Sequence, residues 1–134
     1  MKKIVFALLS TLVIPAAGFA TEAMRDGYWE LTTTMEMPGM PMKLPPSQVT
    51  HCFTKEDVKD QKNTISGNKD CTVTEFNESG NKVTWKMICT GQSAGESSGV
   101  TVFNGDSYES TMKMQTQGQT MDMNVKARRL GNCP

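Results

Sequence analysis

The sequence has few of the residue patterns on which common enzyme chemistries depend. It contains a single histidine, His51, and no G-x-S-x-G segment, so neither a Ser-His-Asp triad nor a nucleophile elbow can be assembled from it. Its carboxylates are dispersed along the chain, and no pair of them can be identified as the acid and base of a glycosidase. We therefore expect a protein that is not an enzyme and that needs no catalytic cofactor.

An excess of positive charge is also missing. The 14 Lys and Arg residues are balanced by 14 Asp and Glu residues. If Lys2 and Lys3 were removed with a signal peptide, 12 basic and 14 acidic residues would remain, a net charge near −2. Proteins that bind nucleic acid carry a basic excess that releases counterions, so we expect no nucleic-acid partner.

A long apolar segment occurs only at the N-terminus. Residues 1–20 combine Lys2 and Lys3, an apolar run over 4–13 and a small-x-small site ending at Ala20, which is the pattern of a secretory signal peptide. The apolar run is too short to span a bilayer. We expect cleavage after Ala20, no membrane span in the remaining chain, and one domain over residues 21–134 that is periplasmic or secreted.

The four cysteines all follow the expected cleavage site. They form no C-x-x-C pair, which argues against structural zinc, and an even number in a small exported domain is typical of two disulfides. Cys71 and Cys89 lie at matching distances from Gly80 in an expected hairpin, so we favour Cys71 with Cys89, which leaves Cys52 with Cys133. The two other pairings stay open on the sequence alone.

Side chains that alternate with a period of two predict a mostly β-structure. Residues 28–37 alternate strictly, with Trp29 and Leu31 on one face, and lead into a loop rich in Met and Pro. Further strands are expected over residues 48–53, 71–77 and 82–90.

Two segments interrupt this pattern. Residues 55–62 are expected to form one short helix, because Thr54 and Asp57 have the spacing of a capping box. The Gly- and Ser-rich segment 91–99 is interpreted as a linker.

Turn residues predict two further hairpins. Asn104-Gly105 marks the first turn, where the apolar pattern favours Val102 facing Tyr108 and therefore a bulge or an odd-length loop. The second turn is centred on Gln117-Gly118, which pairs Lys113 with Asp122 and Glu109 with Lys126 on one face. The other face then carries four paired methionines: Met112, Met114, Met121 and Met123.

These expectations combine into a fold class. We predict an all-β domain, an antiparallel curved sheet or incomplete barrel of about seven strands with one short helix. Trp29 and Trp85 are expected to anchor its core, and His51, alone on an apolar strand face, is expected to be structural.

Methionine provides the one candidate for metal chemistry. Met37, Met40 and Met42 lie in or beside the Pro/Gly loop, and thioethers are ligands that suit Cu(I). The alternative is packing, because Met is a flexible filler of irregular cores and a frequent residue of contact surfaces. Copper is therefore an alternative hypothesis, and no other cofactor is expected.

Five segments together resemble a known family. They are residues 27–42, with the G-x-W-E opening, His51-Cys52 with the five residues after it, Asp70-Cys71, residues 79–89 and Gly131-Asn132-Cys133. Together they resemble the secreted bacterial family catalogued as domain of unknown function 3617. The resemblance covers nearly the whole chain after the signal peptide, and it implies an exported, disulfide-bonded, mostly β domain. It implies no catalytic residues.

Three functional hypotheses follow. The first is a non-enzymatic periplasmic binding or interaction domain, in which the Met-rich face is either filled core or a pocket for a small apolar ligand, or an envelope protein is the partner. The second is copper handling through the Met-rich loop. The third is a purely structural role in the cell envelope.

Overall fold

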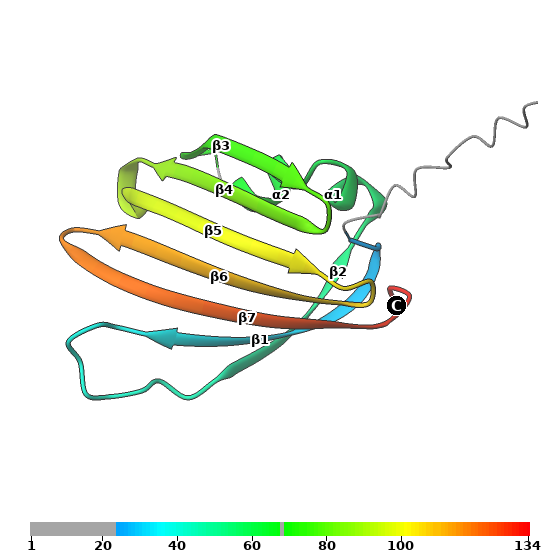
Figure 1. Cartoon of the computed structure of the whole chain (residues 1–134), viewed down its shortest axis with the longest axis horizontal. Helices are drawn as coiled ribbons and strands as arrows, with labels where there is room; N and C mark the ends of the chain where they lie inside the picture. Colours follow the sequence, from blue (N-terminus) through cyan, green and yellow to red (C-terminus); the bar gives the residue numbers. More distant parts are fainter. Residues whose placement is uncertain (1–23, 68) are drawn as a thin grey trace, which may run out of the picture.

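The computed structural model describes residues 24–67 and 69–134, and within them the chain forms one open antiparallel sheet of seven curved strands (Figure 1). The order across the sheet is β2-β1-β7-β6-β5-β4-β3. The strands are β1 (Gly27–Glu36), β2 (Ser47–Phe53), β3 (Cys71–Ser79), β4 (Lys82–Cys89), β5 (Gly95–Phe103), β6 (Ser107–Thr116) and β7 (Gln119–Gly131). The all-β fold class is confirmed, and the expected signal peptide, residues 1–20, lies outside the described residues.

The alternation of β1 sets the inner and outer faces of the sheet. Trp29 is fully buried, and Val83, Trp85, Phe103 and Ala127 join it in one core cluster. We call the side that carries these residues the inner face. Val58 and Ile65 of the helical segment pack against the same cluster, so the inner face is the side that the helices cover.

The last hairpin has the predicted register. Met112 faces Met123 and Met114 faces Met121 on one side of the ladder. Lys113 faces Asp122 on the other side, with Nζ and Oδ1 3.8 Å apart. Opposite charges and apolar pairs thus agree on one alignment, which is why this register could be read from the sequence.

Segment 91–99 is not a linker, and that prediction is wrong. Residues Gly91–Ser93 form a 3₁₀ turn, η1, and β5 begins at Gly95. The predicted pairing of Val102 with Tyr108 is also wrong, because Phe103 faces Tyr108 and Val102 faces Glu109. The small residues Ser97, Gly99 and Thr101 point inward with Phe103, and they fit there because β4 brings the bulky Trp85 beside Gly99.

Two short helices replace the single predicted one. Helix α1 (Lys55–Lys59) begins at the predicted capping box, in which Thr54 and Asp57 exchange hydrogen bonds. Asp60 then ends α1 and caps α2 (Gln61–Ser66) by accepting a hydrogen bond from the Asn63 N–H. The helix breaks here because the backbone of Asp60 is not helical, and its side chain instead accepts a hydrogen bond from a free backbone N–H in the first turn of α2.

The two disulfides bracket the helices. Cys52, just before α1, is bonded to Cys133, and Cys71, just after α2, is bonded to Cys89, which is the pairing that the sequence favoured. Cys71 and Cys89 face each other directly across the β3–β4 ladder. Both ends of the helical segment are therefore tied covalently to distant parts of the chain. Helix α2 contacts β3 (Figure 1).

Among the described residues, none of the helices has the length and apolar character required to cross a membrane.

Candidate functional site

Two rows of inner-face residues cross the sheet and carry most of its methionines. Residues directly opposite on an antiparallel ladder share a face, so a row can be followed from strand to strand. One row runs from β1 to β3 through Met35, Met123, Met112, Gly99, Trp85 and Phe76. The row beside it runs from β7 to β3 through Met121, Met114, Ser97, Met87 and Val73.

A pocket of about 330 Å³ lies between this inner face and the helices. Its wall on the helix side comes from Asp57, Gln61, Thr64 and Ile65, and Phe53 at the end of β2 adjoins them. We call this the inner pocket. The sheet side consists of Leu31, Val83, Trp85, Met87, Ser97, Thr101, Phe103, Tyr108, Ser110, Met112, Met114 and Val125, and Met24 completes the lining. The inner face is thus only partly filled core.

The sheet side of the lining is apolar apart from a small group of hydroxyls. Ser97 and Ser110 are buried, and the Thr101 and Ser110 hydroxyl oxygens are 2.8 Å apart, so one donates a hydrogen bond to the other. The lining holds four methionines, Met24, Met87, Met112 and Met114, which are unbranched and flexible, so they can adjust to a bound molecule. A few fixed polar groups in an apolar cavity are typical of small-molecule sites.

Two ionisable groups belong to the lining. Burial raises the pKa of Tyr108 to about 12, so its hydroxyl stays neutral and can form hydrogen bonds at physiological pH. The pKa of Asp57 is lowered, first by the hydrogen bond from the Thr54 backbone N–H and then by the one from the Thr54 hydroxyl. Asp57 is therefore a carboxylate at neutral pH. Of the described residues, no Lys, Arg or His lines the inner pocket.

A larger hollow of about 530 Å³ on the outer face is a weaker candidate. Its charged side chains already pair with one another: Lys86 lies 3.0 Å from Glu75, and Lys113 lies 3.8 Å from Asp122. These groups are well exposed and compete with water, so the hollow resembles an ordinary solvated sheet face.

The residues of the metal hypothesis lie outside the inner pocket. Met37 follows β1 and accepts a hydrogen bond at its carbonyl oxygen from the Met40 N–H, 3.1 Å away, which forms a turn. Met40 and Met42 are 57 % and 76 % exposed. This loop, residues 37–46, joins β1 to β2 and lies at the end of the sheet farthest from the C-terminus (Figure 1). Within the described residues, no group of three or more His, Cys, Asp or Glu side chains gathers in a manner that could hold a metal.

His51 is an exposed residue of β2 that packs edge-on against Phe53, with ring centroids 4.5 Å apart. It lies close enough to Asp57 to make a small contribution to the lowered pKa of that carboxyl. Its side chain does not line the inner pocket.

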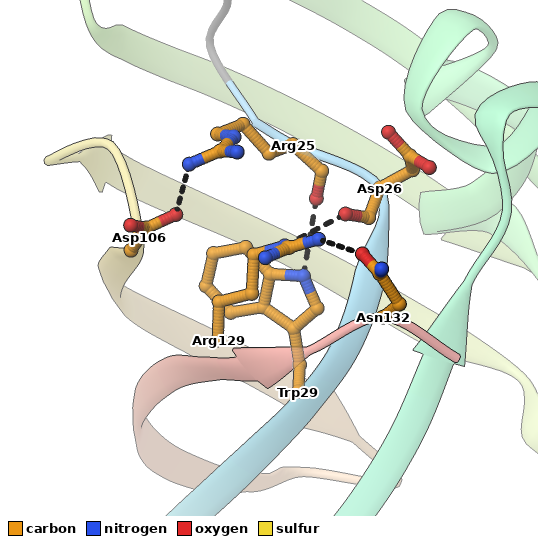
Figure 2. Close-up of polar contacts among 6 residues, drawn as sticks. All are labelled: Arg25, Asp26, Trp29, Asp106, Arg129 and Asn132. Atoms are coloured by element: carbon orange, nitrogen blue, oxygen red, sulfur yellow. Dashed lines mark hydrogen bonds and ion pairs between the residues drawn. The ribbon is translucent and has the colours of Figure 1, made fainter. Parts of the chain in front are cut away.

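The G-x-W-E opening is explained by packing and hydrogen bonding (Figure 2). The Trp29 indole N–H donates to the Arg25 carbonyl oxygen at 3.1 Å, and Arg129 donates to the Asp26 carbonyl oxygen and to the Asn132 side chain. Gly27 has a φ of +140°, and a side chain there would collide with Arg129.

Charged residues extend this network on both sides. Arg25 contacts Asp106 at 2.7 Å, joining the start of the described chain to the β5–β6 turn (Figure 2). Glu30 contacts Arg128 at 2.7 Å across β1 and β7. The motif therefore fixes the ends of β1 and β7 together and has no role in the inner pocket.

Sequence reasoning missed several residues of the inner pocket. Ser97, Thr101 and Ser110 alternate with their neighbours as strand residues should, but their small size made the larger Val102 appear to be the residue that faces Tyr108 on the inner side. Gln61 and Ile65 could not be assigned, because only the packing of α2 against the sheet places them at the pocket.

Comparison with known proteins identifies a family. The family model described as "Protein of unknown function (DUF3617)" matches residues 24–133. The match confirms the resemblance found in the sequence. No curated protein and no solved structure matches the chain.

Proposed function

We propose that this chain, which belongs to the DUF3617 family, is an exported, non-enzymatic domain that binds a small apolar ligand in the inner pocket. The observation that carries the proposal is the pocket itself, about 330 Å³ in volume and lined by aliphatic, aromatic and methionine side chains between sheet and helices. Its volume lies at the lower end of the range for ligand sites, roughly 300–1,000 Å³.

The size of the inner pocket limits its ligand. An apolar cavity of about 150 Å³ holds benzene, with six carbon atoms, so the inner pocket would hold roughly a dozen non-hydrogen atoms. That size suits a short aliphatic chain or a small ring system. The two disulfides support the exported part of the proposal, because such bonds persist in oxidising compartments.

Calorimetric titration with 1-decanol tests the proposal. We expect saturable one-to-one binding with a negative heat-capacity change, because apolar surface leaves water. Met114→Trp should abolish the binding by filling the pocket. Gln115→Trp is the matched control, since Gln115 is the next residue of β6, is exposed and points to the outer face. The proposal is wrong if decanol does not bind, or if both variants bind it as the natural protein does.

Copper handling is the second candidate, and the exposure of Met40 and Met42 favours it. Thioethers need no deprotonation and suit Cu(I). The turn in the loop brings the Met40 backbone N–H within 3.1 Å of the Met37 carbonyl oxygen, so the two residues are close in space. Titration of Cu(I) into the natural protein and into a Met37/Met40/Met42→Leu variant separates the hypotheses. Binding that is lost in the variant supports a copper site, whereas equal or absent binding excludes it.

A structural role in the envelope, with a protein partner, is the third candidate. Exposed apolar side chains on the loop and β2, Met40, Met42, Leu44 and Val49, provide a surface for such a partner.

A further inference from the structure

We infer that the inner pocket selects an uncharged aliphatic ligand and rejects an anionic one of the same length. This inference rests on the proposed function and specifies the chemical class of the ligand. The inference is based on two sides of the pocket that face each other. The sheet side is apolar and carries neutral hydroxyls, and the described residues of the helix side include one carboxylate, Asp57.

The charge distribution at the inner pocket disfavours an anion. A carboxylate or phosphate removed from water needs a cationic partner or several donors to offset its lost hydration. Among the described lining residues, Asp57 is the only side chain that is charged at neutral pH, and none is basic. His51, which contributes to the lowered pKa of Asp57, is exposed on β2 and lies outside the lining.

The carboxylate of Asp57 is held in a fixed place. It accepts hydrogen bonds from the Thr54 backbone N–H at 2.8 Å and from the Thr54 hydroxyl at 2.9 Å, as part of the capping box of α1. These two hydrogen bonds favour a position of the carboxylate at the helix side of the pocket. An anionic head group at the helix side of the pocket would therefore meet a negative charge at neutral pH.

The hydroxyls on the sheet side suit a neutral polar group. Thr101 and Ser110 use one hydrogen in the bond between them, which leaves one hydroxyl hydrogen and free oxygen lone pairs. Tyr108 adds a hydroxyl that stays protonated. An alcohol, ester or amide can donate to or accept from such groups without bringing a charge into the pocket.

A matched pair of ligands tests the inference. At pH 7.5 decanoate is ionised and 1-decanol is neutral, and the two have the same chain. We expect the natural protein to bind decanol at least about tenfold more tightly than decanoate, as measured by calorimetry below the aggregation concentration of either compound. Equal affinities, or tighter binding of decanoate, would overturn the inference and leave the proposed function intact.

A variant then tests the role assigned to Asp57. Asp57→Asn keeps an oxygen that can accept from the Thr54 N–H but removes the charge, so the decanol preference should fall by roughly tenfold. Glu56→Gln is the control, because it removes the same charge one residue earlier on α1, where the side chain does not line the pocket. An unchanged preference in Asp57→Asn, or an equal change in both variants, would refute the role of Asp57. If neither compound binds the natural protein, the proposed function fails and the inference fails with it.

Discussion

At the scale of single residues, Gly99 shows how packing on the inner face depends on the size of the side chains. A Cβ atom at this position would lie 2.6 Å from the ring of Trp85, which itself is a wall of the inner pocket. The aromatic ring therefore occupies the space that a side chain on β5 would need. Trp85 and Gly99 act as one complementary pair across β4 and β5.

Gly99→Ala should lower the free energy of unfolding by about 1 to 3 kcal/mol, because overpacking forces a well-packed ring to move. Urea unfolding followed by tryptophan fluorescence measures the change. Ser98→Ala is the control, because Ser98 is the residue just before Gly99 and its side chain lies on the outer face. It should change the free energy of unfolding by less than about 0.5 kcal/mol. Equal effects of the two substitutions would contradict the close contact of Gly99 with Trp85.

Tyr108 should make stability depend on alkaline pH. Its pKa is raised from 10.0 to about 12 by burial, so between these values the unfolded chain loses the phenolic proton and the folded chain keeps it. Stability is then unaffected by this group below pH 10 and falls as pH rises from about 10 to 12, by on the order of 2 kcal/mol.

Absorbance titration of the phenolate band measures this pKa. The difference between the natural protein and Tyr108→Phe isolates the one group, and its midpoint is expected near 12. A midpoint at 10 would mean that water reaches the Tyr108 hydroxyl freely.

At the scale of elements, the helical segment forms one wall of the inner pocket, and both of its ends are tied down by disulfides. Cys52 precedes α1 and Cys71 follows α2, and their partners lie 81 and 18 residues away in the sequence. Without these ties, the short helices would depend mainly on Val58 and Ile65 for contact with the core. Helices of five and six residues are not stable alone.

Removal of each disulfide by paired Cys→Ala substitution should therefore destabilise the fold to different extents. The chain-entropy model gives about 4.5 kcal/mol for the loop between Cys52 and Cys133 and about 3 kcal/mol for the loop between Cys71 and Cys89. Urea unfolding of the two variants gives the ranking, and decanol binding should weaken in both. A larger loss from the shorter loop would show that native contacts, not chain entropy, determine the cost.

The elements differ in how well the sequence predicted them. The β6–β7 hairpin was predicted residue by residue, because Lys113 opposite Asp122 and Met112 opposite Met123 agree on one register. For β5 the prediction failed, because small residues such as Ser97 and Gly99 do not look like inward-facing residues in the sequence. They fit on the inner face because the ring of Trp85, on the neighbouring strand, fills the space beside Gly99. That information lies in tertiary packing and is absent from the local pattern.

At the scale of the whole molecule, residues 24–67 and 69–134 form an open sheet whose inner face is covered by the helices over part of its area. The core cluster around Trp29 fills one part of that face, and the inner pocket occupies the part between α2 and the methionines of β4 and β6. The sequence predicted the methionine face but not whether it was filled, since this depends on where α2 packs. The central claim is that this remaining space is a ligand site.

Methionine methyl NMR tests this claim most directly, because the methionines report on both the pocket and the exposed loop. In a titration of the ¹³C-methyl-labelled protein with 1-decanol, the signals of Met87, Met112 and Met114 should shift together and saturate. Those of Met40 and Met42 should stay in place, since these side chains are exposed and lie outside the pocket. Unmoved signals from Met87, Met112 and Met114, or shifts confined to Met40 and Met42, would contradict the claim.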